Sequence, residues 1–285
     1  VQQTLQVSQD ELALFVEGRY GWRDVTVTGG LRFTAQHQDA RGWSSVNDQL
    51  WSGYLGADWA VSDAWRATAE IARGARIANL SEKYFSGTSG RGTVFGNPVL
   101  DPEIADSVDI GLIREGSETR VEVHLFSFWL NDFIERVTVG EDSLSFRNQD
   151  GGRIDGVEFV AGWELQPGLE IHLGGHYQDG ESGNGDPLQD VSPNVLSAGL
   201  RYESGDWRWA LDYRHRFAKR DVGDGEQAVD DADLLSLSLG RALSERLSLT
   251  VWARNLLDER YLITTDELST EGEAAALGLT ISWRS

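Results

Sequence analysis

Apolar and polar residues alternate in short runs along the whole chain. In Val25–Thr34, for example, Leu31 and Phe33 flank Arg32. A period of two residues is typical of a β-strand with one apolar face, because successive side chains point to opposite sides of a sheet. The pattern predicts an all-β, antiparallel protein of about 13 strands with no helix. The predicted strands are Ser8–Tyr20, Val25–Thr34, Leu50–Ala60, Trp65–Ile71, Ser107–Arg114, Val121–Val139, Ser143–Leu165, Leu169–Tyr177, Val195–Tyr202, Trp207–Phe217, Leu235–Leu239, Leu247–Arg254 and Leu277–Trp283.

The connections between these strands alternate between short turns and long loops. The short turns are Gly21–Asp24, Ser62–Asp63, Gly116–Thr119, Gln166–Gly168, Ser204–Asp206 and Ser244–Glu245. The long loops are Gln38–Gln49, Ala72–Glu103, Asp179–Pro193, Lys219–Asp233 and Asp258–Glu273, with Gly140–Ser143 as a short exception. Short turns on one rim and long loops on the other are typical of an outer-membrane β-barrel, whose strands are also longer than those of soluble proteins.

Aromatic residues gather beside the short turns. Amphipathic rings of this kind form a girdle at the headgroup depth of a membrane, which supports the barrel interpretation. The residues concerned are Trp22, Trp65, Trp163, Tyr202 and Trp207.

If the apolar face of each strand meets lipid, the polar face lines a lumen. Many charges of both signs need water or another polar protein element beside them, so we expect a wide barrel. Their mixed signs predict a wall that holds something polar, not a strongly ion-selective pore. The predicted wall residues are Glu17, Arg19, Arg32, Arg66, Glu70, Glu122, His124, Glu158, Glu164, Glu170, His172, Arg201, Arg208, Asp212, Arg214 and Arg254.

Ala72–Glu103 is the longest segment without strand periodicity. Its end, Gly96–Glu103, contains two prolines, which restrict the backbone, and a glycine suited to a left-handed conformation. The alternation of connections places this segment on the long-loop rim. We predict a fixed loop that directs the chain into its next strand.

Composition and charge exclude several classes of function. The net charge of −21 argues against binding to nucleic acid, whose phosphates would be repelled. The chain has no Cys, which removes disulfides and thiolate metal sites. It also lacks a run of 18 apolar residues, so no transmembrane helix is predicted.

The polar residues offer no convincing catalytic or metal site. His172 and His176 share a strand face but stand about 13 Å apart, too far to chelate one metal ion. The acids of Asp179–Asp190 lack the spacing of an EF-hand, and Gly-rich phosphate loops and G-x-S-x-G elbows are absent. We therefore predict no enzymatic activity, no cofactor and no metal site.

Strand parity bears on domain organisation. Bacterial barrels formed by one chain have an even number of strands, with both termini on the short-turn rim. Thirteen strands, counted back from Ser285, place Val1 on the opposite rim. We therefore expect residues 1–285 to be the C-terminal part of a larger barrel.

Several motifs, taken together and in this order, resemble TonB-dependent outer-membrane receptors. The resemblance covers nearly the whole chain, with Leu257 at a position where the family usually has Phe. The chain also ends in Trp283-Arg284-Ser285, where many outer-membrane barrels end on an aromatic residue. The motifs are Arg73-Gly74-Ala75-Arg76, Leu80-Ser81-Glu82, Tyr84-Phe85, Gly96-Asn97-Pro98, Leu100, Pro102-Glu103, Phe128, Asn131-Asp132, Ile134, Arg153-Ile154-Asp155-Gly156-Val157-Glu158 and Ala253-Arg254-Asn255-Leu256-Leu257-Asp258 with Tyr261.

The resemblance implies a 22-stranded barrel in the outer membrane of a Gram-negative bacterium, plugged by an N-terminal domain that contacts the TonB complex. Neither that plug nor the first strands lie in these 285 residues. The resemblance further implies uptake of a scarce solute, usually a ferric siderophore, with haem, cobalamin and glycans as alternatives. The partners implied are this small-molecule ligand, the TonB complex through the plug, and outer-membrane lipid with lipopolysaccharide.

The candidate ligand contacts lie in or beside the long irregular segment. They are Arg76, Tyr84, Phe85 and Arg91, because arginines and aromatic rings suit an anionic, catecholate-like complex through charge and stacking. The alternative is that Tyr84 and Phe85 only fasten the loop to its neighbours. Two other functions stay open: a passive porin or structural barrel, and a soluble carbohydrate-binding β-protein.

Overall fold

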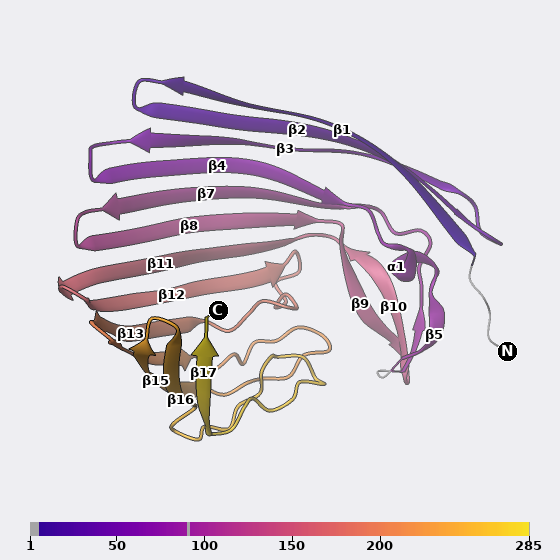
Figure 1. Ribbon diagram of the computed structural model, residues 1–285. Coiled ribbons are helices and arrows are strands. Elements are labelled where there is room, and N and C mark those ends of the chain that lie inside the picture. The colour runs from indigo at the N-terminus through magenta and orange to yellow at the C-terminus, as the bar shows by residue number, and fades with distance from the viewer. Residues whose placement is uncertain (1–5, 90–91, 285) are drawn as a thin grey trace.

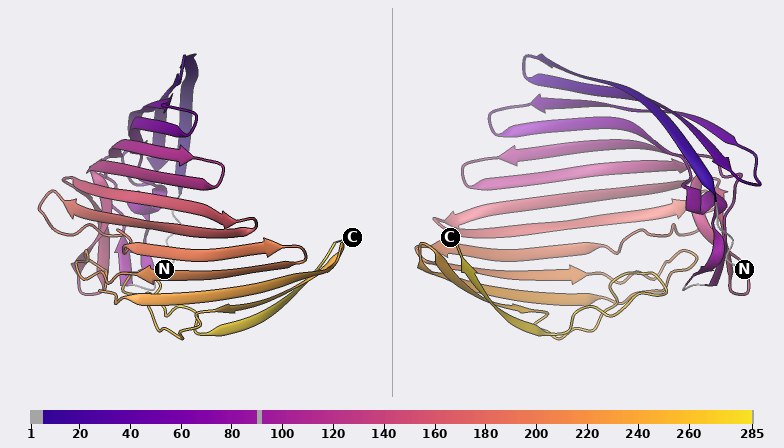
Figure 2. Two further views of the ribbon diagram at one scale, coloured as in Figure 1. Left: turned by 90° about the vertical axis from the view of Figure 1, so that its left-hand side faces the viewer. Right: turned by 45° about the vertical axis from the view of Figure 1, so that its right-hand side comes forward.

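In the computed structural model, which describes residues 6–89 and 92–284, thirteen antiparallel strands form one curved sheet (Figures 1 and 2). Each strand pairs with the previous and the next strand of that sheet, so β1 and β17 are its edges. The predicted fold class and strand number are confirmed. The strands are β1 Val7–Trp22, β2 Val25–Ala40, β3 Val46–Ala60, β4 Trp65–Arg76, β7 Glu103–Glu115, β8 Thr119–Asn131, β11 Gly152–Gln166, β12 Leu169–Ser182, β13 Val195–Ser204, β14 Trp207–Arg216, β15 Ala232–Ser244, β16 Leu247–Arg254 and β17 Ala276–Trp283.

The short turns and the long connections lie at opposite ends of the sheet, as the alternation predicts (Figure 1). The predicted loops Ala72–Glu103 and Asp179–Pro193 begin too early, because β4 continues to Arg76 and β12 to Ser182, and a third predicted loop is mostly strand. β2 and β3 continue well into Gln38–Gln49, so only residues 41–45 connect them. Their side chains on the polar face, such as Gln38 and Asp48, are covered by other residues of the rim, so the backbone ladder continues beyond the alternating pattern.

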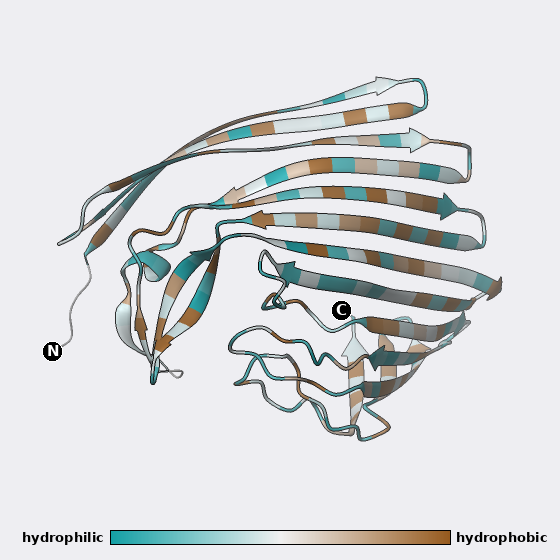
Figure 3. Cartoon of the chain, turned by 180° about the vertical axis from the view of Figure 1, so that it is seen from behind, coloured by the Kyte–Doolittle hydropathy of each residue, from teal (hydrophilic) through white to brown (hydrophobic). Residues whose placement is uncertain are grey.

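The two faces of the sheet differ in hydropathy, which appears as alternating bands along the strands (Figure 3). Cross-strand register places every predicted wall residue on one and the same face. Glu158, for example, lies opposite His124 on one side and His176 on the other. Leucines and other large apolar side chains dominate the exposed residues of the opposite face.

The predicted aromatic girdle is present at the short-turn end of the apolar face. The Tyr202 and Trp209 rings stack with centroids 5.8 Å apart, and the Arg241 guanidinium lies 4.8 Å from the centre of the Trp207 ring. The Arg23 guanidinium lies 5.0 Å from the Trp22 ring. Arginines over tryptophan faces are expected where rings meet a polar boundary.

A second, smaller sheet lies at the long-loop end, in the order β5–β6–β10–β9 (Figure 1). Together with one short helix it forms what we call the rim domain. The helix is five residues long, and among the described residues no helix could cross a membrane. The elements are α1 Leu80–Tyr84, β5 Ser86–Ser89, β6 Gly92–Phe95, β9 Phe133–Gly140 and β10 Ser143–Gln149.

The rim domain explains where the sequence pattern was wrong about continuous strands. Val121–Val139 is broken at Asp132, and Ser143–Leu165 is broken near Gly151. Both residues have positive φ, 52° and 131°, which interrupts a strand and redirects the chain. The β9–β10 hairpin therefore leaves the large sheet, and the exceptional short turn Gly140–Ser143 is its tip.

The short helix was also not predicted, although its capping signal is present in the sequence. The Asn79 side chain accepts hydrogen bonds from the backbone of Ser81 and Glu82, and the Glu82 side chain accepts one from the Asn79 N–H. This reciprocal capping box supports a single turn that is too short to show helical periodicity.

Candidate functional site: the polar wall and the long-loop rim

Histidine–aspartate pairs lie along the polar wall. His172 Nε2 lies 3.1 Å from Asp212 Oδ1, and the His172 ring covers Gly199, where a Cβ atom would come within 2.2 Å of it. His124 and Asp109 form a second pair at 3.0 Å. A glycine on the neighbouring strand thus gives the ring room to reach its carboxylate. These pairs hold imidazole and carboxylate groups in fixed positions on the wall.

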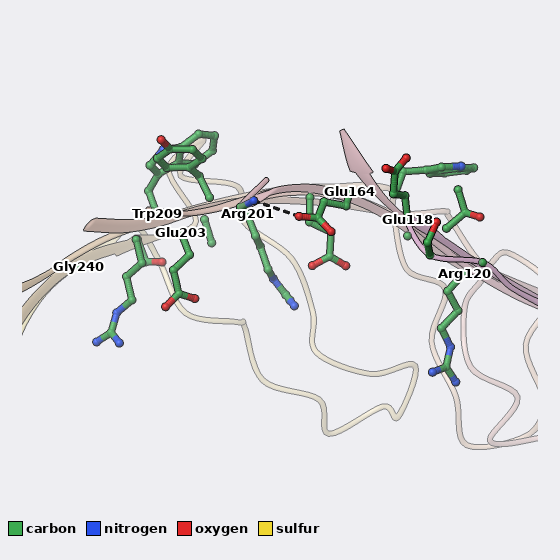
Figure 4. Close-up of a pocket in the computed structure, with 18 of the residues that line it drawn as sticks. Glu118, Arg120, Glu164, Arg201, Glu203, Trp209 and Gly240 are labelled. Carbon is green, nitrogen blue, oxygen red and sulfur yellow. Dashed lines mark hydrogen bonds between the residues drawn. The ribbon is translucent and has the colours of Figure 1, made fainter. Parts of the chain in front are cut away.

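A cavity of about 760 Å³ lies on this wall near the short turns (Figure 4). Arg120, Arg201 and Glu203 point to one side of the sheet, and Trp209 points to the other (Figure 4). The charged residues that line the cavity are Glu115, Glu118, Glu164, Glu170, Glu203, Arg120, Arg201 and Arg208. Such a surface can hydrogen-bond water or a polar protein segment through both donors and acceptors. Across the described residues, no group of three His, Cys, Asp or Glu side chains is placed to hold a metal ion.

The predicted ligand residue Arg76 lies at the end of β4, where it joins three elements. Its Nη1 donates to Glu82 Oε2 of α1 at 2.8 Å, and its Nε donates to Glu103 at the start of β7. The guanidinium therefore neutralises two carboxylates at once. This arrangement gives Arg76 a bracing role between the sheet and the rim domain.

Tyr84 and Phe85 lie together at the end of α1 but differ in exposure. Tyr84 is only 4% exposed, and among the described residues its hydroxyl has no hydrogen-bond partner. Burial, with the nearby charges of Asp48 and Asp39, raises the pKa of Tyr84. Phe85 is 40% exposed, so its ring can meet a solute. The fourth predicted contact, Arg91, lies outside the described residues.

No sequence pattern indicated the most buried charge among the described residues of the rim domain. Lys83 follows Glu82 on α1, and its side chain is 0% exposed. Its Nζ lies 3.3 Å from Asp48 Oδ2 on β3. A buried lysine is uncommon unless it is paired, so this contact fastens α1 to the large sheet.

The segment of residues 96–102, just before β7, is held by asparagine side chains. These contacts account for the Gly96-Asn97-Pro98 motif of the resemblance. Asn97 Nδ2 donates to the Phe146 carbonyl at 2.8 Å, and Asn148 Oδ1 accepts from the Asp101 N–H at 2.9 Å. Gly96 does not adopt the left-handed conformation that the sequence suggested; glycine is needed because a Cβ there would come within 2.7 Å of the backbone of Lys83. The segment is therefore fixed against β10 and α1, which agrees with the prediction of a rigid entry into the next strand.

Three further connections meet at the same end of the sheet, and we call them the loop lobe. They are residues 183–194, 217–231 and 255–275. Asn255, in a left-handed conformation with φ 46°, donates from Nδ2 to the carbonyls of Glu259 and Glu273 at 2.9 and 2.8 Å. Arg216 is buried and donates to the Leu262 and Asp230 carbonyls, with Tyr261 against its guanidinium. The Asn255–Tyr261 motif is thus a loop anchor.

Comparison with known proteins agrees with this architecture. The family model described as TonB dependent receptor-like, beta-barrel matches residues 2–256. A curated relative, the pesticin receptor of Yersinia enterocolitica, is 24% identical over 261 residues, which cover 82% of this chain and 37% of the receptor.

Solved structures share the fold. The copper transporter OprC superposes with a TM-score of 0.86 at 17% identity, over 97% of this chain and 48% of that chain. The ferric yersiniabactin uptake receptor FyuA of Yersinia pestis superposes with a TM-score of 0.70 at 20% identity, over 97% and 44%. This chain therefore spans less than half the length of each of these three relatives. Because the family model covers most of the chain and the observed fold matches it, the chain belongs to the TonB-dependent receptors, within their β-barrel domain.

Proposed function

We propose that this chain forms wall strands and the mouth of an outer-membrane receptor, where the mouth is the rim domain together with the loop lobe. This receptor takes up a ferric siderophore with energy from the TonB complex. The observation that carries the proposal is the family match over residues 2–256, whose members are receptors and transporters of the Gram-negative outer membrane and not enzymes. Relatives named for the uptake of iron complexes include the ferric yersiniabactin uptake receptor. That this chain is the C-terminal part of a larger barrel stays a prediction.

The mixed-charge wall supports a barrel interior that is filled by protein. Fixed carboxylates and guanidiniums line the cavity near the short turns, where a plug domain would offer matching polar groups. The TonB complex would act on such a plug and not on the strands. The apolar face, with its aromatic girdle, would contact outer-membrane lipid and lipopolysaccharide.

The mouth suggests which ferric complexes would be accepted. Phe85 and Arg91 are the proposed ligand contacts, while Arg76 and Tyr84 support the rim domain beside Phe85. The loop lobe carries many more acidic than basic residues, so its field opposes polyanionic complexes. We propose a neutral or cationic ferric siderophore in place of the catecholate-like anion that the arginines alone would favour.

Copper is a weaker candidate, although one solved relative is a copper transporter. Soft thiolate and thioether ligands favour Cu(I), and these 285 residues contain neither Cys nor Met. The chain itself therefore offers no reason to prefer copper over a ferric complex.

Uptake measurements on the full-length gene test the proposal. Cells expressing it in a receptor-deficient host are supplied with iron-labelled neutral hydroxamate and anionic catecholate complexes, with and without collapse of the proton-motive force. We expect accumulation of the neutral complex that stops when the force is collapsed. Entry that continues unchanged would support the passive porin instead, and exclusive uptake of the anionic complex would overturn the charge argument.

A further inference from the structure

We infer that Glu226 is the positioning residue of the receptor mouth: it fastens the three segments of the loop lobe into one unit. The inference rests on the proposed receptor function only for its purpose at the mouth. The coupling itself follows from the contacts of one carboxylate, which reach residues from all three segments.

The Glu226 carboxylate accepts four hydrogen bonds, two on each oxygen. Oε1 accepts from the Asp190 N–H at 3.1 Å and from Thr265 Oγ1 at 2.5 Å. Oε2 accepts from the Gly223 N–H at 2.9 Å and from Lys219 Nζ at 3.5 Å. A carboxylate has about four lone-pair sites, so its accepting capacity is used completely. Asp190 lies in residues 183–194, Thr265 lies in 255–275, and the other two donors lie in 217–231.

Burial makes these bonds obligatory. The Glu226 side chain is 4% exposed and that of Lys219 is 14% exposed. A carboxylate removed from water is unfavourable unless partners replace its hydration, so losing one donor cannot be compensated by solvent. Lys219 Nζ also donates to the Val191 carbonyl at 2.7 Å, which adds a second link between 217–231 and 183–194.

Gln227, the residue after Glu226, adds contacts between 217–231 and 255–275. The Gln227 N–H donates to the Thr265 carbonyl at 2.6 Å, and Gln227 Nε2 donates to the Asp266 carbonyl at 2.9 Å. One isolated bridge, Glu226 with Asp266, also joins 217–231 to 255–275, and single backbone bonds run from the Phe217 N–H to the Asn194 carbonyl and from the Glu267 N–H to the Gly225 carbonyl. These contacts are short and separate, in contrast to the long ladders of the sheet. Among these separate contacts, the Glu226 carboxylate is the point at which donors from all three segments meet.

The network around Glu226 also borders a rim cavity of about 490 Å³. Its walls come from the part of β12 that extends beyond β13 and from two segments of the loop lobe. Lys219 and Val191 both line it, and both are held by the contacts described above. Glu226 therefore sets the shape of this cavity from behind its wall, without facing it.

Hydrogen exchange on the purified full-length receptor in detergent tests the coupling without any ligand. In Glu226→Gln, the amide nitrogen must face two donors whichever way the group is turned. We expect exchange to be at least about tenfold faster in all three segments, with the strands unchanged. Asp224→Asn, which removes one negative charge from an exposed position of the same segment, is the control and should leave exchange unchanged.

Thr265→Val provides the second variant, because it removes one donor and keeps the carboxylate and the side-chain shape. We expect faster exchange in 255–275 alone, with 183–194 and 217–231 still protected. Faster exchange in Glu226→Gln that is confined to 217–231 would overturn the inference, as would unchanged exchange in both variants. Since transport is not measured, failure here is distinct from failure of the proposed receptor function.

Discussion

The rim domain and the loop lobe each contain one of the two lysines of the chain, and both lysines are nearly buried. They are fastened differently. Lys83 has one carboxylate partner, Asp48 on the large sheet, and the rim domain has a four-stranded sheet of its own. Lys219 belongs to a network around Glu226, in a region whose segments are joined by separate contacts and not by a long β-ladder. In the rim domain, which has its own β-ladder, the buried ion pair only attaches the domain to the large sheet. In the loop lobe, which has no such ladder, the network joins the segments.

The largest expected effect is the removal of the docking pair. Lys83→Met leaves Asp48 without its counter-charge in a nearly buried place, which should cost about 3 kcal/mol of local stability. We expect α1 to detach from β3 while β5, β6, β9 and β10 keep their pairing. Hydrogen exchange of residues 80–84 against those of β10 measures the difference.

The double variant Lys83→Met with Asp48→Asn is the matched control, because it removes the stranded charge. Partial recovery of protection in α1 is expected. Equal exchange in the single and double variants would contradict the docking role of the pair.

A smaller effect is expected from the corresponding change in the loop lobe. Lys219→Met removes one of four donors to Glu226 and the bond to the Val191 carbonyl, which should cost about 2 kcal/mol. We expect faster exchange in 183–194 and 217–231, while Thr265 keeps 255–275 in place. A loss of protection as large as that of Lys83→Met in α1 would remove the contrast between the two regions.

The smallest effect concerns pH. Burial raises the pKa of Glu226, but the bonds from Thr265, Gly223 and Asp190 and the charge of Lys219 outweigh it, so the pKa lies below its ordinary 4.5. A group with a lowered pKa in the folded state stabilises fully above its ordinary pKa and loses that contribution as the pH falls through the folded value.

We therefore expect the protection of the loop lobe to be constant from neutral pH down to 4.5 and to decrease below it. Exchange rates corrected for intrinsic pH dependence, with Glu226→Gln as the variant that cannot titrate, measure this. A loss of protection in the wild type that begins near neutral pH would contradict the assignment to Glu226.

Some features of the rim domain could be predicted from the sequence. The Asn79-x-x-Glu82 spacing is a capping signal that a search for helical periodicity passes over, because one turn has no period to detect. The strand breaks at Asp132 and Gly151 are also residues that tolerate positive φ. The proposed ligand role of Phe85 and Arg91 stays a prediction, since sequence placed them near the mouth without showing what they face.

The sequence by itself determined the sheet. Its strand number, the sorting of its connections and the two faces follow from a period of two residues and from turn chemistry, which are local properties of the backbone. Only the tertiary structure decided that β9 and β10 leave the sheet, that Lys83 is buried against Asp48 and that Glu226 joins three loops. These features depend on buried contacts between residues tens of positions apart in the chain. The alternation of apolar and polar residues is a local pattern and does not indicate such contacts.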